Sequence, residues 1–509
     1  MSVNPTIYPP STVANLSAAS TKSTGEQVVS FFFGVLSGIS VVAAMVAPGK
    51  PDAMFIGVVL GIVALTLALL FVAKLRQPKP VNWLTADVLF TISFCLIHFG
   101  YFTYWILGAT GGSRELWYFG HSPCPHTVCK GIAMYSAVVN SFLAGFYLLR
   151  TRRWVGKINE QAPSKSVRVK WGQLGRLMVR LGCVCFCAFI VIFGPARFFG
   201  HYSGTNNVSF LANIFYQIGQ VLLMSGVAIS MASKQRLIKM VKRKHRFSLG
   251  VSLLDALLIA GFCCAIGIHG DRSTLLYLVG AFVVAYSEFV KPIPLKKLVL
   301  SGTVLVFFLG FIIAFRAEKT QVYNFDPLTN INAALLNMGT SSVCGFVAID
   351  YTDSYGHTNG WMQVKQLAGI IPFGRRIFGL GDGVENSSAA LLTLLIQGKR
   401  GKGVAGTGSS VFADSYFDFG LSGSLLIFFA VGLLAKNVQN RARTSTSILW
   451  QVILVTLVSF LAVCSRYTFT GGLIRTVLYS GIYTWFIFFV LGVPIRYRLQ
   501  KSARMFSAR

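Results

Sequence analysis

Acidic side chains are scarce in this chain. Its 509 residues include 16 Asp and Glu against 46 Lys and Arg, and only 12% of the residues are charged. A soluble protein of this length could not cover its surface with so little charge. With 54% hydrophobic residues and a mean hydropathy of +0.63, the chain has the composition of a polytopic membrane protein.

Several sequence signatures are also missing. We find no Walker motif, no dinucleotide-binding fingerprint and no set of metal ligands at a common spacing. We therefore predict neither a cofactor nor a metal. The first 26 residues have no basic start followed by an apolar core, which predicts that no signal peptide is cleaved. The two halves of the sequence do not repeat each other, and this disfavours a transporter built from duplicated bundles.

Long apolar runs fill most of the sequence. A helix needs roughly 20 residues to cross the ~30 Å hydrocarbon core of a bilayer. About twelve runs are long enough: 27–47, 54–74, 86–109, 131–149, 177–196, 208–232, 248–268, 273–290, 298–315, 421–436, 446–464 and 476–493. We predict an all-α polytopic membrane protein of about 12 transmembrane helices, with one large loop between helices 9 and 10.

The basic residues are concentrated in alternate loops. Six segments hold 30 of the 46 Lys and Arg, and the only acid among them is Glu160. This bias places these loops and both termini in the cytoplasm, and it explains the net charge of +30 without a nucleic-acid partner. The predicted regions are a cytoplasmic tail (1–26), nine helices (27–315), a periplasmic loop (316–421), three helices (422–493) and a basic cytoplasmic tail (494–509).

The loop 316–421 differs from the rest of the chain because its eight acidic and eight basic residues balance. Within it, 328–349 and 385–398 are apolar enough to form helices, whereas 350–361 and 399–410 are rich in Gly, Asp, Asn and Ser. Helices resting on the outer leaflet satisfy their own backbone and leave the glycine segments free to approach a ligand. We predict a folded cap over a cavity between helices.

Five arginines on the predicted outer side are candidates for binding an anion. Arg272 lies in the tight hairpin 270–274, Arg466 and Arg475 lie in the last outer loop, and Arg375 and Arg376 lie in the large loop. A guanidinium has a fixed charge and a planar fork that suits phosphate oxygens. The alternative is that these side chains snorkel to lipid headgroups. With no nucleotide motif present, the predicted anion is a lipid diphosphate.

Candidates for proton transfer are fewer. His357 lies in the glycine-rich part of the loop and could take a proton from a sugar hydroxyl, although a solvated loop histidine is the commoner case; Asp271 is the second candidate. Cys124 and Cys129 lie in a short outer loop where an oxidising compartment would allow a disulfide. The predicted spans contain few ionisable residues, namely Asp87 and Glu288 near cytoplasmic ends and His98 and Asp255 deeper. A proton-coupled pump usually needs more buried charge.

These features together resemble the O-antigen polymerases, the Wzy-type oligosaccharide repeat unit polymerases. The resemblance rests on the twelve-span layout with a large outer loop before the last three spans, on the hairpin 270–276 with its arginine, and on the stretch 408–423 that enters a span. It implies a GT-C-like membrane glycosyltransferase that needs no metal and works at the periplasmic face of the bacterial inner membrane.

The resemblance also implies the reaction and its partners. The growing chain would move from an undecaprenyl-diphosphate carrier to a sugar hydroxyl on the next lipid-linked repeat unit, yielding O-antigen or a related surface polysaccharide. Arg272, Arg466 and Arg475 match outer arginines of the family and would neutralise the departing diphosphate. Membrane lipids and a chain-length regulator (co-polymerase) are the further partners. Three alternatives stay open: an O-antigen ligase acting on lipid A core, a flippase or other transporter, and a membrane scaffold.

Overall fold

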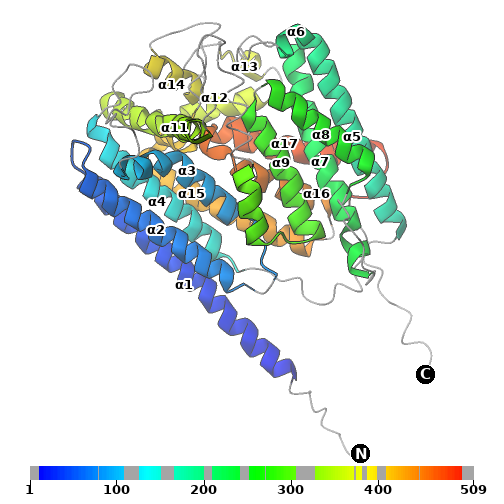
Figure 1. Cartoon of the computed structure of the whole chain (residues 1–509), viewed down its shortest axis with the longest axis horizontal. Helices are drawn as coiled ribbons and strands as arrows, with labels where there is room; N and C mark the ends of the chain where they lie inside the picture. The colour runs from blue at the N-terminus through cyan, green and yellow to red at the C-terminus, as the bar shows by residue number, and fades with distance from the viewer. Residues whose placement is uncertain are drawn as a thin grey trace, which may run out of the picture.

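The computed structural model describes residues 11–77, 80–107, 125–150, 165–199, 209–240, 251–269, 271–304, 327–371, 374–380, 387–397, 409–445 and 447–495. Nearly all of these residues are helical, and no strand occurs among them (Figure 1). The all-α class is confirmed for the described part of the chain.

Two groups of long helices lie side by side (Figure 1). Bundle A contains α1 (Ser11–Met45), α2 (Ala53–Leu75), α3 (Ala86–Ile106), α4 (Val128–Leu148) and α15 (Val411–Thr444). Bundle B contains α5 (Lys165–Phe193), α7 (Phe210–Met240), α8 (Leu253–His269), α9 (Arg272–Ala285), α16 (Ile448–Leu461) and α17 (Arg475–Val490). Short turns of helix accompany them: η1 (Pro125–Thr127), α6 (Pro195–Phe198) and the π-helical η4 (Tyr286–Val290). Helix α16 joins the bundles because it packs on α3 and α15 as well as on its own neighbours.

Small residues set the closest helix contact in bundle B. Gly175 and Gly182 of α5 face Gly226 and Gly219 of α7, so the two helices approach each other at points seven residues apart on each. A Cβ atom added at Gly226 would lie 2.7 Å from the carbonyl oxygen of Gly175. Close backbone approach at small residues is how helices associate in lipid, where apolar burial alone does not drive association.

Nine helices of the described part are long and apolar enough to cross a membrane. Two more predicted spans, 248–268 and 446–464, correspond to the shorter apolar helices α8 and α16. Of the predicted span at 298–315, only the helical residues up to 304 are described. A multi-pass membrane protein is therefore confirmed, and the number twelve stays a prediction.

Four cap helices lie at the end of the molecule opposite to the start of α1 (Figure 1). They are α11 (Pro327–Tyr355), α12 (Trp361–Ile370), α13 (Gly374–Ile377) and α14 (Ser388–Gln397). Helices α11 and α14 occupy the segments expected to be helical, although α11 continues beyond 349 to Tyr355. We call these helices, with residues 409–419, the cap, and we call the end where α1 begins and α17 ends the basal end.

Helix α15 is sharply folded and does not run straight. Gly420 has φ 61° and ψ −161°, a conformation open essentially to glycine alone. The hydroxyls of Ser415 and Ser424 are 2.9 Å apart, whereas nine residues of straight helix would separate them by about 13.5 Å. Residues 411–419 therefore form a short arm, which we call the buried arm, folded back against the membrane-spanning residues 421–444. The predicted start of a span at 421 coincides with this fold.

Ion pairs at the basal end fix the bundles. Lys74 contacts Asp87 at 2.8 Å with both side chains buried. Arg443 of α15 contacts Glu288 of η4 at 2.9 Å and so links bundle A to bundle B. Asp255, which was predicted to lie deep in a span, is in the first turn of α8 with Arg180 of α5 at 3.5 Å. Its depth in the membrane stays a prediction. The negative charge of Asp255 is favourable in this first turn because the N-terminus of a helix is electropositive.

Candidate functional site

Two carboxylates of the buried arm organise the cap. Asp414 and Asp418 lie one helical turn apart, and both are almost fully buried. Asp414 accepts hydrogen bonds from the backbone N–H of Phe469 (2.7 Å), from Gln366 Nε2 (2.6 Å) and from Ser388 Oγ (2.5 Å). One carboxylate thereby connects α12, α14 and the segment that precedes α17.

Asp418 holds the start of α12. Its carboxylate accepts hydrogen bonds from the backbone N–H groups of Met362 (3.0 Å) and Gln363 (2.9 Å) and from the hydroxyl of Thr358. Backbone N–H groups in the first turn of a helix have no partner within the helix, and a carboxylate placed there is favourable for both hydrogen bonding and electrostatics. The donors to both aspartates are uncharged groups.

The segment 463–475, which we call the arginine loop, carries Arg466 and Arg475. It contains a 3₁₀ turn, η6 (Cys464–Arg466), and a π-helix, η7 (Phe469–Ile474), which continues into α17. Besides the bond from Phe469 to Asp414, the N–H of Gly471 donates to Gln366 Oε1 (3.2 Å) and Thr470 donates to Gln363. The loop is therefore fixed by α12 and the buried arm.

The Arg466 side chain is exposed, yet the surrounding protein desolvates it and lowers the pKa of its guanidinium below the ordinary value. Cys344 of α11 and Tyr467 are the ionisable groups close enough to act on it. No hydrogen bond or ion pair joins this side chain to any residue that the structure describes. A cation held close to protein but open to solvent on one side is suited to an anionic ligand.

Arg475 lies near Tyr277, as Tyr467 does. It is the first residue of α17, is half-buried and interacts electrostatically with Tyr277 of α9 and with Tyr479. Tyr467 acts on both Arg466 and Tyr277. Arg466 therefore lies near Tyr467 and Arg475 near Tyr277, and these two tyrosines lie close to each other beside bundle B.

The hairpin that contains Asp271 and Arg272 also lies near Tyr467. Asp271 is the N-cap of α9, and its carboxylate accepts from Tyr216 (2.5 Å), from Ser273 (2.8 Å), and from the hydroxyl (2.7 Å) and N–H (3.2 Å) of Thr274. These bonds give Asp271 a structural role, and a catalytic one stays a prediction. Tyr216 interacts electrostatically with Tyr467. The backbone of Arg272 begins α9, but its side chain lies outside the described residues.

His357 lies at the fold in α15. Its side chain is exposed, and its ring centroid is 5.6 Å from that of Tyr416. A Cβ atom at Gly420 would come within 2.8 Å of His357 Nε2, so the ring packs directly on the backbone of the fold. These contacts place His357 beside the buried arm; its proposed role in proton transfer remains a prediction.

The other predicted site residues lie apart or are not described. Arg376 is exposed on α13, and the side chain of Arg375 lies outside the described residues. The Cys129 thiol is buried and donates to the carbonyl oxygen of Lys50 at 3.4 Å. Its predicted disulfide partner, Cys124, falls outside the described ranges, so the pairing is not tested.

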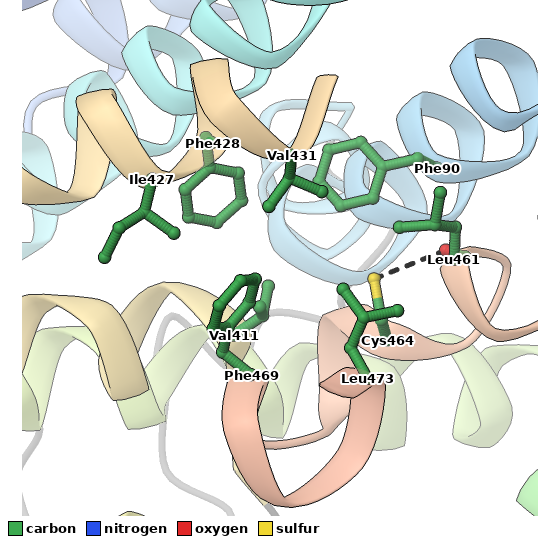
Figure 2. Close-up of a pocket in the computed structure, with 9 residues that line it drawn as sticks. All are labelled: Phe90, Val411, Ile427, Phe428, Val431, Leu461, Cys464, Phe469 and Leu473. Carbon is green, nitrogen blue, oxygen red and sulfur yellow. Dashed lines mark hydrogen bonds between the residues drawn. The ribbon is translucent and has the colours of Figure 1, made fainter. Parts of the chain in front are cut away.

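A small apolar cavity lies under the arginine loop, between the bundles (Figure 2). Figure 2 shows Ile427, Phe428 and Val431 on one side and Val411 and Phe469 on the other. Its volume of about 10 Å³ leaves room for no more than one water molecule. It is too small for a sugar or a lipid chain and reflects the packing of the buried arm.

Asp414 and Asp418 were not predicted to act in the site. Their signal is visible in the sequence: two acids four residues apart in the otherwise mostly apolar run 411–419. That spacing places them on one face of a helix. In the part of the chain that the structure covers, no group of three His, Cys, Asp or Glu residues is placed to hold a metal ion.

Comparison with protein families decides the identity of this arrangement. The family model for the O-antigen polysaccharide polymerase Wzy matches residues 27–500, nearly the whole chain. The chain belongs to the Wzy O-antigen polymerase family. No curated protein and no solved structure matches it. Membership in the Wzy family indicates a multi-pass membrane polymerase, similar to a glycosyltransferase, that acts on lipid-linked oligosaccharide repeat units.

Proposed function

We propose that this chain polymerises undecaprenyl-diphosphate-linked oligosaccharide repeat units at the periplasmic face of the bacterial inner membrane. The hydroxyl oxygen of the acceptor sugar forms the new glycosidic bond as the bond between the donor sugar and the diphosphate breaks. The diphosphate leaves with that electron pair, and the hydroxyl proton passes to a base or to water. A co-polymerase that limits chain length is an expected partner.

The observation that carries this proposal is the position of Arg466. Its exposed guanidinium has no bonded partner among the described residues, and the surrounding protein desolvates it, so charge on a leaving diphosphate would interact strongly with it. Arg475, which like Tyr467 lies near Tyr277, can supply a second guanidinium, and Arg272 at the start of α9 a third. A diphosphate is a good leaving group, so the step needs little help from a base such as His357.

The proposal requires the cap to face the periplasm and the basal end the cytoplasm. Six basic segments, which include the ends of α2 and α15 and the start of α5, support this orientation. A periplasm-active reporter fused after Gly360 should be active, and one fused after Lys244 should be inactive. The reverse pattern would move the arginine loop to the cytoplasm and discard the proposed site.

The polymerisation step is tested by deleting the gene and separating the surface lipopolysaccharide on a gel. We expect the ladder to collapse to core carrying a single repeat unit. Loss of all O-antigen from the core, with long polymer accumulating on the lipid carrier, would identify a ligase. An unchanged ladder would contradict both activities for lipopolysaccharide and favour a transporter or another polymer.

Complementation of the deletion tests the arginines. Arg272→Lys keeps the charge but loses the planar fork, and we expect it to shorten the ladder strongly. Full activity of this variant would exclude a bidentate role for Arg272.

A further inference from the structure

Helix α12 has two faces, and the outer one is apolar. Trp361, Val364 and Leu367 follow one another at a spacing of three residues and are 55%, 48% and 45% exposed, and Ile371 continues the row at 51%. The opposite face is bound to the buried arm and the arginine loop through Gln363 and Gln366, as described above. A helix facing water rarely exposes such a row of large apolar side chains, so the outer face requires a partner.

The row meets the lipid-facing surface of α17. The hydroxyl of Tyr479 donates to the carbonyl oxygen of Ile370, which places the end of α12 beside the second turn of α17. On either side of Tyr479, Leu478 and Ile482 are 46% and 47% exposed on a helix that is long and apolar enough to cross the membrane. The exposed face of α12 therefore continues an apolar surface that already faces lipid.

The charges along α12 and α13 fit the boundary between lipid tails and headgroups. The sequence has no Asp or Glu from 354 to 381, where it has Lys365, Arg375 and Arg376. The Lys365 ammonium lies 5.9 Å from the centre of the Trp361 ring. Ile377 and Phe378 of the α13 turn are also exposed. Tryptophan and basic residues at the edge of an apolar face are typical of helices lying in the membrane interface.

We propose that α12 and the α13 turn lie in the plane of the membrane, with Trp361, Val364, Leu367 and Ile371 inserted among the acyl chains of the leaflet at the cap end. The occupant of the exposed face is the lipid bilayer itself. Since the other face of α12 holds the arginine loop, insertion would fix Arg466 and Arg475 at the depth of lipid headgroups. The cap would then be anchored in the membrane at its edge.

Fluorescence quenching by brominated lipids tests this contact without any measurement of activity. The purified full chain and its Trp361→Phe variant are reconstituted in phosphatidylcholine vesicles. The lipid chains are unbrominated, brominated near the headgroup, or brominated near the methyl end. The emission lost in the variant is the contribution of Trp361. We expect bromine near the headgroup to remove most of this contribution and bromine near the methyl end to remove less.

Two other tryptophans calibrate the measurement. Trp485 is 50% exposed on α17, and Trp485→Phe should reveal a contribution that brominated lipid quenches. Trp171 is buried at the basal end, where its Nε1 donates to the carbonyl oxygen of Pro494 (2.8 Å), so its contribution should resist quenching. As a second reporter, Leu367→Trp in the Trp361→Phe background should restore a signal that brominated lipid quenches.

If the contribution of Trp361 resists brominated lipid but is quenched by a water-soluble quencher, the face lies in water and the proposal is wrong. If it resists both, another copy of the chain covers the face, and the proposal is equally overturned. Either outcome leaves the proposed polymerase function untouched, because that is judged from the lipopolysaccharide ladder.

Discussion

The two ends of the molecule use charge in opposite ways. At the basal end, Asp87 and Glu288 each have a cationic partner within 2.9 Å. In the cap, the buried Asp414 and Asp418 accept hydrogen bonds only from uncharged donors of the described residues, while Arg466 nearby has no bonded partner there. The basal cations are therefore part of the scaffold, whereas the arginine loop beside the cap keeps a cation available.

This difference explains how the acids of the cap and Arg466 of the arginine loop can lie close together without forming an ion pair. An aspartate paired with Arg466 would neutralise the guanidinium and compete with an anionic substrate. Backbone N–H groups at helix starts satisfy a carboxylate without that competition. The acids of the cap fix the positions of helices, and the arginine they help to position remains free to bind a ligand.

The largest effect is expected from breaking the basal pair between Arg443 and Glu288. Removing one partner of a buried ion pair leaves an uncompensated charge and costs about 3–5 kcal/mol. The Arg443 and Glu288 side chains are 18% and 11% exposed. We therefore expect Arg443→Ala to lower the free energy of unfolding by about 3 kcal/mol, the lower end of this range. The measurement is thermal unfolding in detergent.

Arg441 supplies the matched control, because its guanidinium stacks over Trp450 at 4.8 Å and makes no described ion pair. Arg441→Ala should lower the free energy of unfolding by no more than about 1 kcal/mol. Replacing both Arg443 and Glu288 by methionine should recover much of the stability. Equal losses in Arg443→Ala and Arg441→Ala would show that the basal pair is not a structural element.

The second effect concerns activity. Arg466→Lys keeps the charge but loses the planar fork, and removing a charge-assisted bond of about 1.5–3 kcal/mol should slow polymerisation roughly tenfold to a hundredfold. The rate is measured with purified lipid-linked repeat units, and the unfolding temperature should stay unchanged because no described bond is lost. Arg176→Lys, on the exposed face of α5, is the control and should keep full activity. A stable Arg466→Lys enzyme with the normal rate would remove Arg466 from the site.

The third prediction tests the neutral donors of the cap. In Asp414→Asn, one carboxylate oxygen is replaced by an NH₂ group, which cannot accept a hydrogen bond. This NH₂ group must face either the N–H of Phe469 or the donors Gln366 and Ser388. The unsatisfied donors should lower the free energy of unfolding by about 1–3 kcal/mol. We expect lower stability together with slower polymerisation, since Phe469 belongs to the arginine loop. Asp418→Asn should lower stability comparably but preserve more activity. If Asp418→Asn were the more harmful to activity, α12 and not Asp414 would position the loop.

Much of the fold can be predicted from the sequence because the hydrophobic and charge patterns are long. The apolar runs, the basic loops and the start of a span at 421 need no knowledge of distant contacts. Helix α12 was not predicted, because Trp361, Val364 and Leu367 on one face and Met362, Ala368 and Ile370 on the other leave no single apolar stripe. The pairing of Asp414 with Phe469 joins residues 55 positions apart, and nothing local in the sequence indicates it.

The smallest effect is expected at two exposed contacts that the described residues of α11 make with α4 and η1. Lys130 contacts Asp353 at 2.7 Å, but the side chains are 33% and 48% exposed. Water screens such a pair, so Lys130→Ala should lower the free energy of unfolding by at most about 1 kcal/mol. Added salt should abolish the difference in unfolding temperature between this variant and the unmodified protein. The measurement is the unfolding temperature at low and high salt, with His126→Ala as a parallel test of the neighbouring contact to Asp350. A loss as large as that of Arg443→Ala, unaffected by salt, would mean that the cap relies on ion pairs as the basal end does, and the contrast between the two ends would fail.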